Sequence, residues 1–408
     1  MYRRIFIVLL LVMNIFVLSG CWDRHELEDF GIINGIGIEE GREGKIKIVI
    51  QTLNVGALAK GAGGKAVEFE KAYRNTVLEG DSVYEALSKY STITSTERHL
   101  SHNSLYIVSE EFARERGVQD LLDYFEREPE TRKDAWFIIG RGSLVNLLDV
   151  PGRLTTTPAQ RISDIIKSRD ESFSYAPLRL EEFIRVLQSD SSEPYTAVVE
   201  HQDNASYTTE QGHGILDGNV PEPLYNTVLN GTAVFKKDRM MGWLDQYESQ
   251  GLLWLRGDVK GGGTIIFSIP EKEGKKVVTT ILDAKGKLEP EIKDGQIYIT
   301  AKIEVKSFLE DNQAGIKIDQ PEEVEKLEAA QGEEVKRQIE AALQKAQHLY
   351  NVDVFGFGEA VHRKYPGEWK ELKRQWPEFF PDVQVDVQVQ SLIEHTAATG
   401  NAPKLGEE

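Results

Sequence analysis

The sequence of 408 residues contains a single cysteine, Cys21. One thiol cannot close an internal disulfide, and it cannot supply a zinc site that is built from several cysteines. No thiol follows residue 21, so cysteine-based catalysis is also excluded in the rest of the chain. Core packing alone must therefore stabilise the folded protein.

Basic residues are scarce relative to acidic ones, with 48 Lys and Arg against 66 Asp and Glu and a formal net charge of −18. The phosphate backbone of nucleic acid would repel such a chain, so nucleic acid is a poor partner. Anionic lipid head groups would repel it too. We therefore expect the body of the protein to stand off a bilayer and to contact other proteins.

Hydrophobic runs are short after Cys21, and none approaches the ~20 residues of a membrane-spanning helix. The one pronounced apolar stretch comes before it. A basic start, an apolar segment with one polar residue and a short small-residue motif follow each other there: Arg3-Arg4, Ile5 to Leu18 with Asn14, and Leu18-Ser19-Gly20-Cys21. This order is typical of a secretion signal that ends in a lipobox.

The lipobox predicts that residues 1–20 are a signal peptide and that Cys21 is the lipid attachment site. We expect Cys21 to carry a diacylglyceryl group and, after cleavage, an N-linked acyl chain such as palmitate. Two or more acyl chains anchor a protein stably, because each buried methylene contributes roughly 0.8 kcal/mol. An uncleaved anchor helix and an ordinary signal with a chance cysteine remain alternatives, although the position of the only cysteine favours the lipobox.

The length and the changes in composition predict a multi-domain chain. We assign residues 21–150 to an N-terminal α+β domain, 151–224 to a middle region of helices and a strand, and 225–395 to a C-terminal α+β domain. A segment rich in Gly, Asn and Pro, residues 202–223, is the best candidate for a linker. Residues 396–408 form a polar tail.

Hydrophobic periodicity predicts an α+β fold with mixed and antiparallel sheets and packed helices. Alternating residues predict a hairpin over 32–50, and they predict long antiparallel strands over 297–305 and 383–389. The strongest helix is expected over 321–350, with an apolar stripe from Val324 to Leu349, and it should pack across the C-terminal sheet. Asp81 is expected to cap a helix that begins near Val83.

Residues that could carry chemistry are few, and each has a structural explanation. His99 and His102 are three apart, but a pair without a third ligand is more often a polar pair than a metal site. Gly261-Gly262-Gly263 lacks the lysine of a phosphate loop, so we expect it to form a turn. For Gly356-Phe357-Gly358 we expect tight packing of the backbone against the long helix. We expect no catalytic, cofactor-binding or metal-binding residues, and no cofactor.

An apolar cluster of aromatic residues lies near the end of the chain. Trp369 and Trp376 are seven residues apart, which places them on one face of a helix, and Phe379 and Phe380 follow. We expect core packing against the sheet, and a docking surface for a partner helix is the alternative.

Several short motifs occur in the same order as in a known family. They are Gly20-Cys21-Trp22-Asp23 with Glu26-Leu27, Gly35-Ile36-Gly37-Ile38, Ser101-His102-Asn103, the stretch from Leu121 to Ile139, Gly231-Thr232-Ala233-Val234-Phe235 with Gly242-Trp243-Leu244, and Phe355-Gly356-Phe357-Gly358-Glu359 through Tyr365-Pro366 and Trp376 to Val387. With these motifs the chain resembles the Ger(x)C family, the lipoprotein C subunits of spore-germination nutrient receptors. The segment from Ser391 to Glu408 does not fit the family pattern.

The resemblance implies a three-domain α+β protein without enzymatic activity. It implies a lipid-anchored subunit on the outer face of the inner spore membrane, in complex with the integral-membrane A and B subunits of the receptor. The B subunit resembles an amino-acid transporter and is taken to bind the nutrient. A solute-binding lipoprotein that feeds a transporter is the alternative, although that class needs two doubly wound lobes. A surface hydrolase is a third reading, for which no Gly-x-Ser-x-Gly motif is present.

Overall fold

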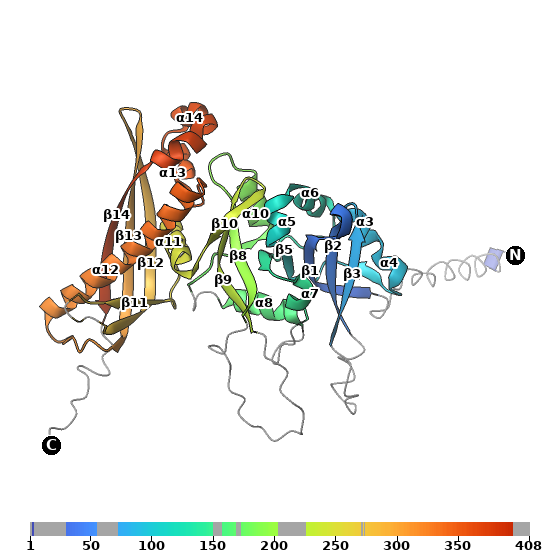
Figure 1. Cartoon of the computed structure of the whole chain (residues 1–408), viewed down its shortest axis with the longest axis horizontal. Helices are drawn as coiled ribbons and strands as arrows, with labels where there is room; N and C mark the ends of the chain where they lie inside the picture. The colour runs from blue at the N-terminus through green and yellow to red at the C-terminus, as the bar shows by residue number, and fades with distance from the viewer. Residues whose placement is uncertain are drawn as a thin grey trace, which may run out of the picture.

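The computed structural model describes residues 2–3, 30–54, 72–149, 157–168, 173–202, 226–270, 272 and 274–394. Most of the predicted signal peptide, the lipid attachment site Cys21, nearly all of the predicted linker 202–223 and the tail 396–408 lie outside these residues. Those predictions therefore stay predictions. The described chain forms two sheets with their helices, which lie side by side in Figure 1.

The first sheet has ten strands in the order β10-β9-β8-β6-β5-β1-β2-β3, with β4 beside β1 and β7 beside β6. Its centre is parallel, because β1, β5, β6 and β8 run in one direction, while the hairpins at both ends are antiparallel. The strands are β1 (Phe30–Glu40), β2 (Ile46–Leu53), β3 (Tyr73–Gly80), β4 (Glu97–His99), β5 (Leu105–Ser109), β6 (Trp136–Arg141), β7 (Leu178–Arg179), β8 (Tyr195–Gln202), β9 (Asn226–Lys236) and β10 (Arg239–Leu244).

Helices cover both faces of the first sheet. The helices α7 (Leu144–Leu147) and α8 (Pro158–Lys167) pack on one face. The other face is covered by α3 (Val83–Ser88), α4 (Tyr90–Ile93), α5 (Glu110–Glu115), α6 (Gln119–Arg127) and α10 (Leu180–Leu187). This explains why β5 is apolar at every position from Leu105 to Val108, since a central parallel strand is buried on both sides.

The second sheet has four strands in the order β11-β12-β13-β14. They are β11 (Thr264–Ser268), β12 (Lys276–Lys293), β13 (Gln296–Asn312) and β14 (Gln384–Glu394). The long helix α12 (Pro321–Leu343) crosses one face, as Figure 1 shows, and continues as a π-helix over Gln344–Leu349. The buried residues Ile297, Ile299, Ala301, Ile303 and Val305 face this helix layer, and the residues between them are exposed or half-buried, as the alternation predicted.

The helix α11 (Gln246–Arg256) packs against α12 at very close range. A Cβ atom on Gly251 would lie 2.0 Å from the carbonyl oxygen of Gln338, so the crossing requires glycine. The indole nitrogen of Trp254 donates to Oε1 of Gln338 at 2.8 Å across the same contact. Beyond α12 the chain forms α13 (Phe357–Lys364) and α14 (Pro366–Phe379) before it enters β14.

Three local predictions were wrong. The strands β13 and β14 pair in parallel, with Tyr298 opposite Gln384, because the helices between them return the chain to the starting end of β13. Ser82, and not Asp81, caps α3 through its hydroxyl, which accepts from the Glu85 amide at 3.1 Å. Leu349, placed on the buried stripe, is 67% exposed, because the π-helix turns it away from the sheet.

The first sheet extends across the sequence positions at which we drew domain boundaries. The strand β8 comes from the range 151–224 and the strands β9 and β10 from the range 225–395, yet all three belong to the sheet of β1 to β6. The prediction of a mixed sheet and a mostly antiparallel C-terminal sheet is confirmed. The domain division itself stays a prediction.

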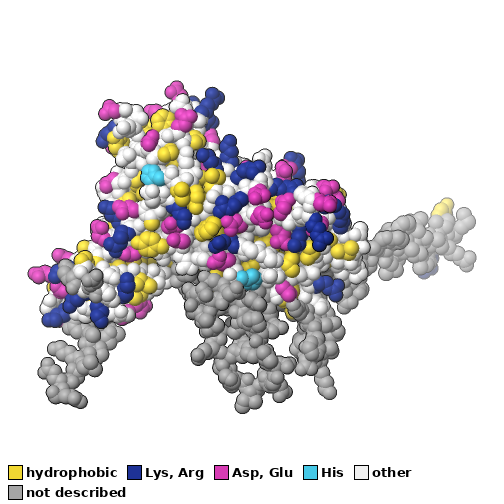
Figure 2. All heavy atoms as spheres, viewed as in Figure 1, with side chains coloured by type: hydrophobic (Ala, Val, Ile, Leu, Met, Phe, Trp, Pro, Cys, Tyr) yellow, Lys and Arg dark blue, Asp and Glu magenta, His cyan; other side chains and the backbone are white. Residues whose placement is uncertain are grey.

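The two sheets share one continuous hydrophobic core. The side chain of Arg256 joins them, since its Nη1 donates to the carbonyl oxygen of Val354 at 2.9 Å and its guanidinium lies 4.9 Å from the ring centre of Tyr195 in β8. Figure 2 shows acidic and basic side chains interspersed over the visible face, with apolar atoms in small separate patches. None of the helices in the described ranges has the length and apolar character needed to cross a membrane.

Candidate functional site

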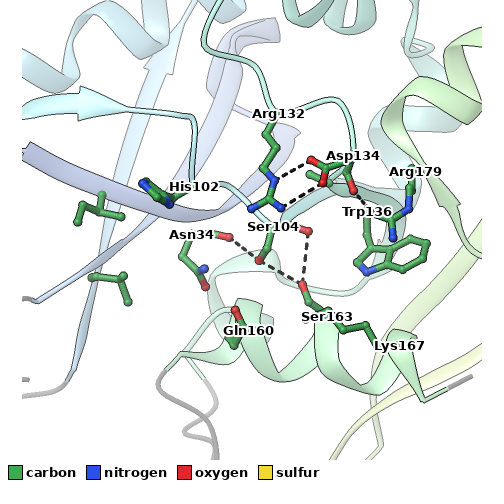
Figure 3. A pocket seen from close by; sticks show the side chains of 13 residues that line it. Asn34, His102, Ser104, Arg132, Asp134, Trp136, Gln160, Ser163, Lys167 and Arg179 are labelled. Atoms are coloured by element: carbon green, nitrogen blue, oxygen red, sulfur yellow. Dashed lines mark hydrogen bonds and ion pairs between the residues drawn. The ribbon is translucent and has the colours of Figure 1, made fainter.

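A cavity of about 460 Å³ opens at the amino ends of the parallel strands β1, β5 and β6. Figure 3 shows the side chains that line it, which come from β1, β2, β6, β7 and α8 and from the loops before β5 and β6. Because these elements are far apart in sequence, the cavity exists only in the folded sheet.

Neutral polar groups form the deeper part of the cavity. The hydroxyl of Ser104 donates to the carbonyl oxygen of Asn34 at 3.0 Å, and the hydroxyl of Ser163 donates to that of Ser104 at 3.2 Å. The side-chain oxygen of Asn34 accepts from the hydroxyl of Thr157. These bonds connect β1, the loop before β5 and α8, and so they fix the shape of the floor.

Basic residues surround this floor. Nε of Arg132 lies 2.6 Å from Oδ1 of Asp134, and Nη2 lies 3.1 Å from Oδ2, which makes a two-pronged ion pair. The hydrogen bond from Arg132 lowers the pKa of Asp134 below its ordinary value. Lys167 pairs with Asp164 at 2.8 Å, one turn earlier on α8.

Among the described residues, Arg179 has no direct ion pair, and its surroundings hold it in place in other ways. It lies opposite Trp136 in the β6–β7 pairing, and its guanidinium stacks 4.4 Å from the centre of the indole ring. Its Nη1 also donates to the backbone carbonyl of Asp134. The arrangement holds the planar guanidinium at the cavity, where its remaining N–H groups can donate to a ligand.

His102 lines the cavity, but His99 does not. The two imidazole rings are 5.6 Å apart between centroids and tilted by 47°, and Nδ1 of His99 is 4.0 Å from Oε2 of Glu130. Within the described ranges no group of three or more His, Cys, Asp or Glu side chains could hold a metal ion.

The motif around Gly356 has a structural role in the C-terminal part. The buried carboxylate of Asp353 accepts hydrogen bonds from the amides of Gly356, Phe357 and Gly358 at 3.0, 3.1 and 2.7 Å, and from the indole nitrogen of Trp376 at 3.0 Å. Burial raises the pKa of Asp353, and the four hydrogen bonds act in the opposite direction. The carboxylate thereby caps the start of α13.

Tight packing is confirmed at Gly358 but not at Gly356, where a Cβ atom would have no neighbour closer than 3.6 Å, and its partner is different from the predicted one. A Cβ atom on Gly358 would lie 2.6 Å from the carbonyl oxygen of Ser191 and 2.8 Å from the Trp369 ring, so the close contacts are with the loop between α10 and β8 and with α14, not with α12. Trp369 and Trp376 are 1% and 5% exposed, which confirms core packing. Gly262 has φ +109 in a turn, as predicted.

Most of the cavity carries no signal of a binding site in the sequence. His102 and the residues from Arg132 to Trp136 lie in segments that match family motifs, but nothing in those segments marks them as the lining of a cavity, and Ser163 and Arg179 are isolated residues elsewhere. A spacing rule cannot find residues that converge from so many separate elements.

Two family models match the chain, one to its N-terminal half and one to its C-terminal half. Residues 23–201 match the spore germination protein N-terminal domain, and residues 230–397 match the C-terminal model described as spore germination B3/GerAC-like. The chain is thus a two-part α+β protein of the spore germination class. It belongs to the Ger(x)C family.

Relatives extend over nearly the full chain. The sequence is 24% identical to spore germination protein KC of Bacillus subtilis (strain 168), over 99% of this chain and 98% of that protein. It is 25% identical to spore germination protein YndF of the same strain, over 96% and 97%. The crystal structure of the GerBC protein matches with a TM-score of 0.56 at 18% identity and covers 91% of this chain and 99% of that one, which shows a shared fold.

Proposed function

We propose that this protein is a non-catalytic, lipid-anchored subunit of a nutrient germinant receptor and that spore germination requires it. The observation that carries the proposal is the match of both family models, over residues 23–201 and 230–397, in a chain whose only cysteine is the last residue of a lipobox. The relatives named above as spore germination proteins support it.

The mechanism in this proposal is contact at a membrane surface. The acyl chains on Cys21 hold the body on the outer face of the inner spore membrane, beside two integral-membrane subunits, A and B. Restriction to a plane raises the effective concentration of each partner, so interfaces of modest area suffice. The shared core and the Arg256 contact make the two sheets one body, which could present a single combined surface to its partners.

Recovery of the intact complex tests this proposal. A chain tagged after residue 408 and purified from spore membranes in mild detergent is expected to carry both integral-membrane subunits in fixed ratio. A tagged unrelated lipoprotein from the same membranes is the control and should carry neither. If the chain is cross-linked in intact spores and is then purified without either subunit, the result contradicts the proposal.

A solute-binding lipoprotein was the alternative. That class binds its ligand between two doubly wound lobes, at the carboxyl ends of parallel strands. Here the second sheet is mostly antiparallel, and the described cavity lies at the amino ends of β1, β5 and β6. The fold therefore favours the receptor subunit.

A further inference from the structure

We propose that the cavity at the amino ends of β1, β5 and β6 is a binding site for a phosphate group carried by a small organic molecule or by a lipid head group. This goes beyond the subunit role above and does not depend on it. The chemistry of the lining carries the inference.

Arg179 supplies the principal cation. In the described part of the chain it makes no direct ion pair, although its charge helps to lower the pKa of Asp134, whereas the other two lining cations, Arg132 and Lys167, each pair directly with a carboxylate. Stacking on Trp136 and the bond to the Asp134 carbonyl fix the guanidinium in place. A preorganised arginine with unused N–H groups is suited to the oxygen atoms of a phosphate.

Two neutral donors add to this cation. Asn34 and Trp136 are each 8% exposed and both line the cavity. Among the residues that the structure describes, the Asn34 side-chain nitrogen and the Trp136 indole nitrogen make no hydrogen bond, so both are available to a ligand in the cavity. A ligand oxygen in the cavity would satisfy both.

The charge of the lining also contrasts with that of the protein. Arg132, Lys167 and Arg179 line the cavity with one carboxylate, Asp134, in a chain with a net charge of −18. The carboxylate is paired with Arg132 and also interacts with the charge of Arg179, so the lining keeps an excess of positive charge and favours an anion. The volume of about 460 Å³ exceeds the needs of a bare phosphate and leaves room for an organic group such as glycerol.

The position of the cavity allows either source of phosphate. Ile32 on β1 lines it and follows Cys21 by eleven residues, which can span roughly 40 Å at most when extended. A lipid head group is within that reach if Cys21 is anchored, and a soluble phosphate compound can enter from solvent.

Calorimetric titration of the full chain in a non-ionic detergent tests the proposal. The probes are inorganic phosphate, glycerol 1-phosphate and a short-chain phosphatidylglycerol, with acetate as the comparison anion. We expect saturable binding of at least one phosphate probe. Arg179→Gln should weaken it about tenfold or more, because charge-assisted hydrogen bonds to the phosphate are lost. Lys167→Gln, a change at an exposed position, should weaken it about threefold or more.

The matched control is Lys133→Gln, which removes an exposed charge next to Arg132 without touching the cavity lining and should leave binding within about twofold. Thermal unfolding of each variant checks that the fold is intact. Binding of phosphatidylglycerol alone would assign the site to a head group, and equal binding of glycerol 1-phosphate would assign it to a soluble compound. No saturable binding, binding unchanged in both cavity variants, or acetate binding as tight as phosphate would overturn the proposal.

Discussion

Cys21→Ala is expected to leave the protein folded but to release it from the membrane and to slow nutrient-triggered germination by roughly tenfold or more. Without the thiol no diacylglyceryl group can be attached, and the loss of anchoring removes an effective-concentration gain of ~10²–10⁴ for the partners. Among the residues that the structure describes, the first buried apolar side chain is that of Ile33, so alanine at position 21 removes no core contact seen there. Membrane fractionation and the optical density of germinating spores measure the two effects.

Ser19→Ala is the matched control for that variant. It keeps a small residue beside the predicted cleavage site, so processing, membrane attachment and germination should stay at the level of the unchanged protein. A normal germination response from spores in which the Cys21→Ala protein is wholly soluble would contradict the proposed role of the anchor.

Asp353→Ala is expected to lower the free energy of unfolding of the C-terminal part by about 3–5 kcal/mol. Its carboxylate accepts from three backbone amides at the start of α13 and from the Trp376 indole, all in the core, and alanine leaves these four donors buried without an acceptor. The backbone carbonyl of Asp353 also accepts from the amide of Glu193 at 2.9 Å, so a disturbed turn weakens the junction with the first sheet. Urea unfolding followed by circular dichroism measures the change.

Hydrogen exchange supplies a local readout for the same variant. The amides of Gly356, Phe357 and Gly358 should lose most of their protection, while those of β5 should keep theirs. Asp386→Ala, which removes an exposed carboxylate on β14, is the control and should change stability by less than about 0.5 kcal/mol. Equal stability of the Asp353 and Asp386 variants would show that the buried carboxylate is not needed.

Local periodicity predicted most of the strands and helices, since burial on one face imposes a repeat on the sequence. The alternation from Val383 to Val389 correctly predicted a strand, and the stripe from Val324 to Leu349 correctly predicted the long helix, although Leu349 at its end is exposed. However, the periodicity of a strand does not show in which direction the strand runs in the sheet. Whether β14 runs parallel or antiparallel to β13 depends on how α12, α13 and α14 carry the chain across the sheet.

The order of the strands in the first sheet could not be predicted from local patterns either. Its parallel centre pairs strands from distant segments, such as Ile139 of β6 with Val198 of β8. The same non-local pairing assembles the cavity, where Arg179 meets Trp136 only because β7 pairs with β6. By contrast, the short motifs correctly identified the family, because the order in which many of them occur is far more specific than any single one.

Mass spectrometry of the amino terminus of the native protein, purified from spore membranes, tests the central claim most directly. The account predicts a chain that begins at Cys21 and carries a diacylglyceryl group on its sulfur, with or without an additional N-linked acyl chain. An unmodified Cys21, with the leader retained or removed at another position, would contradict it.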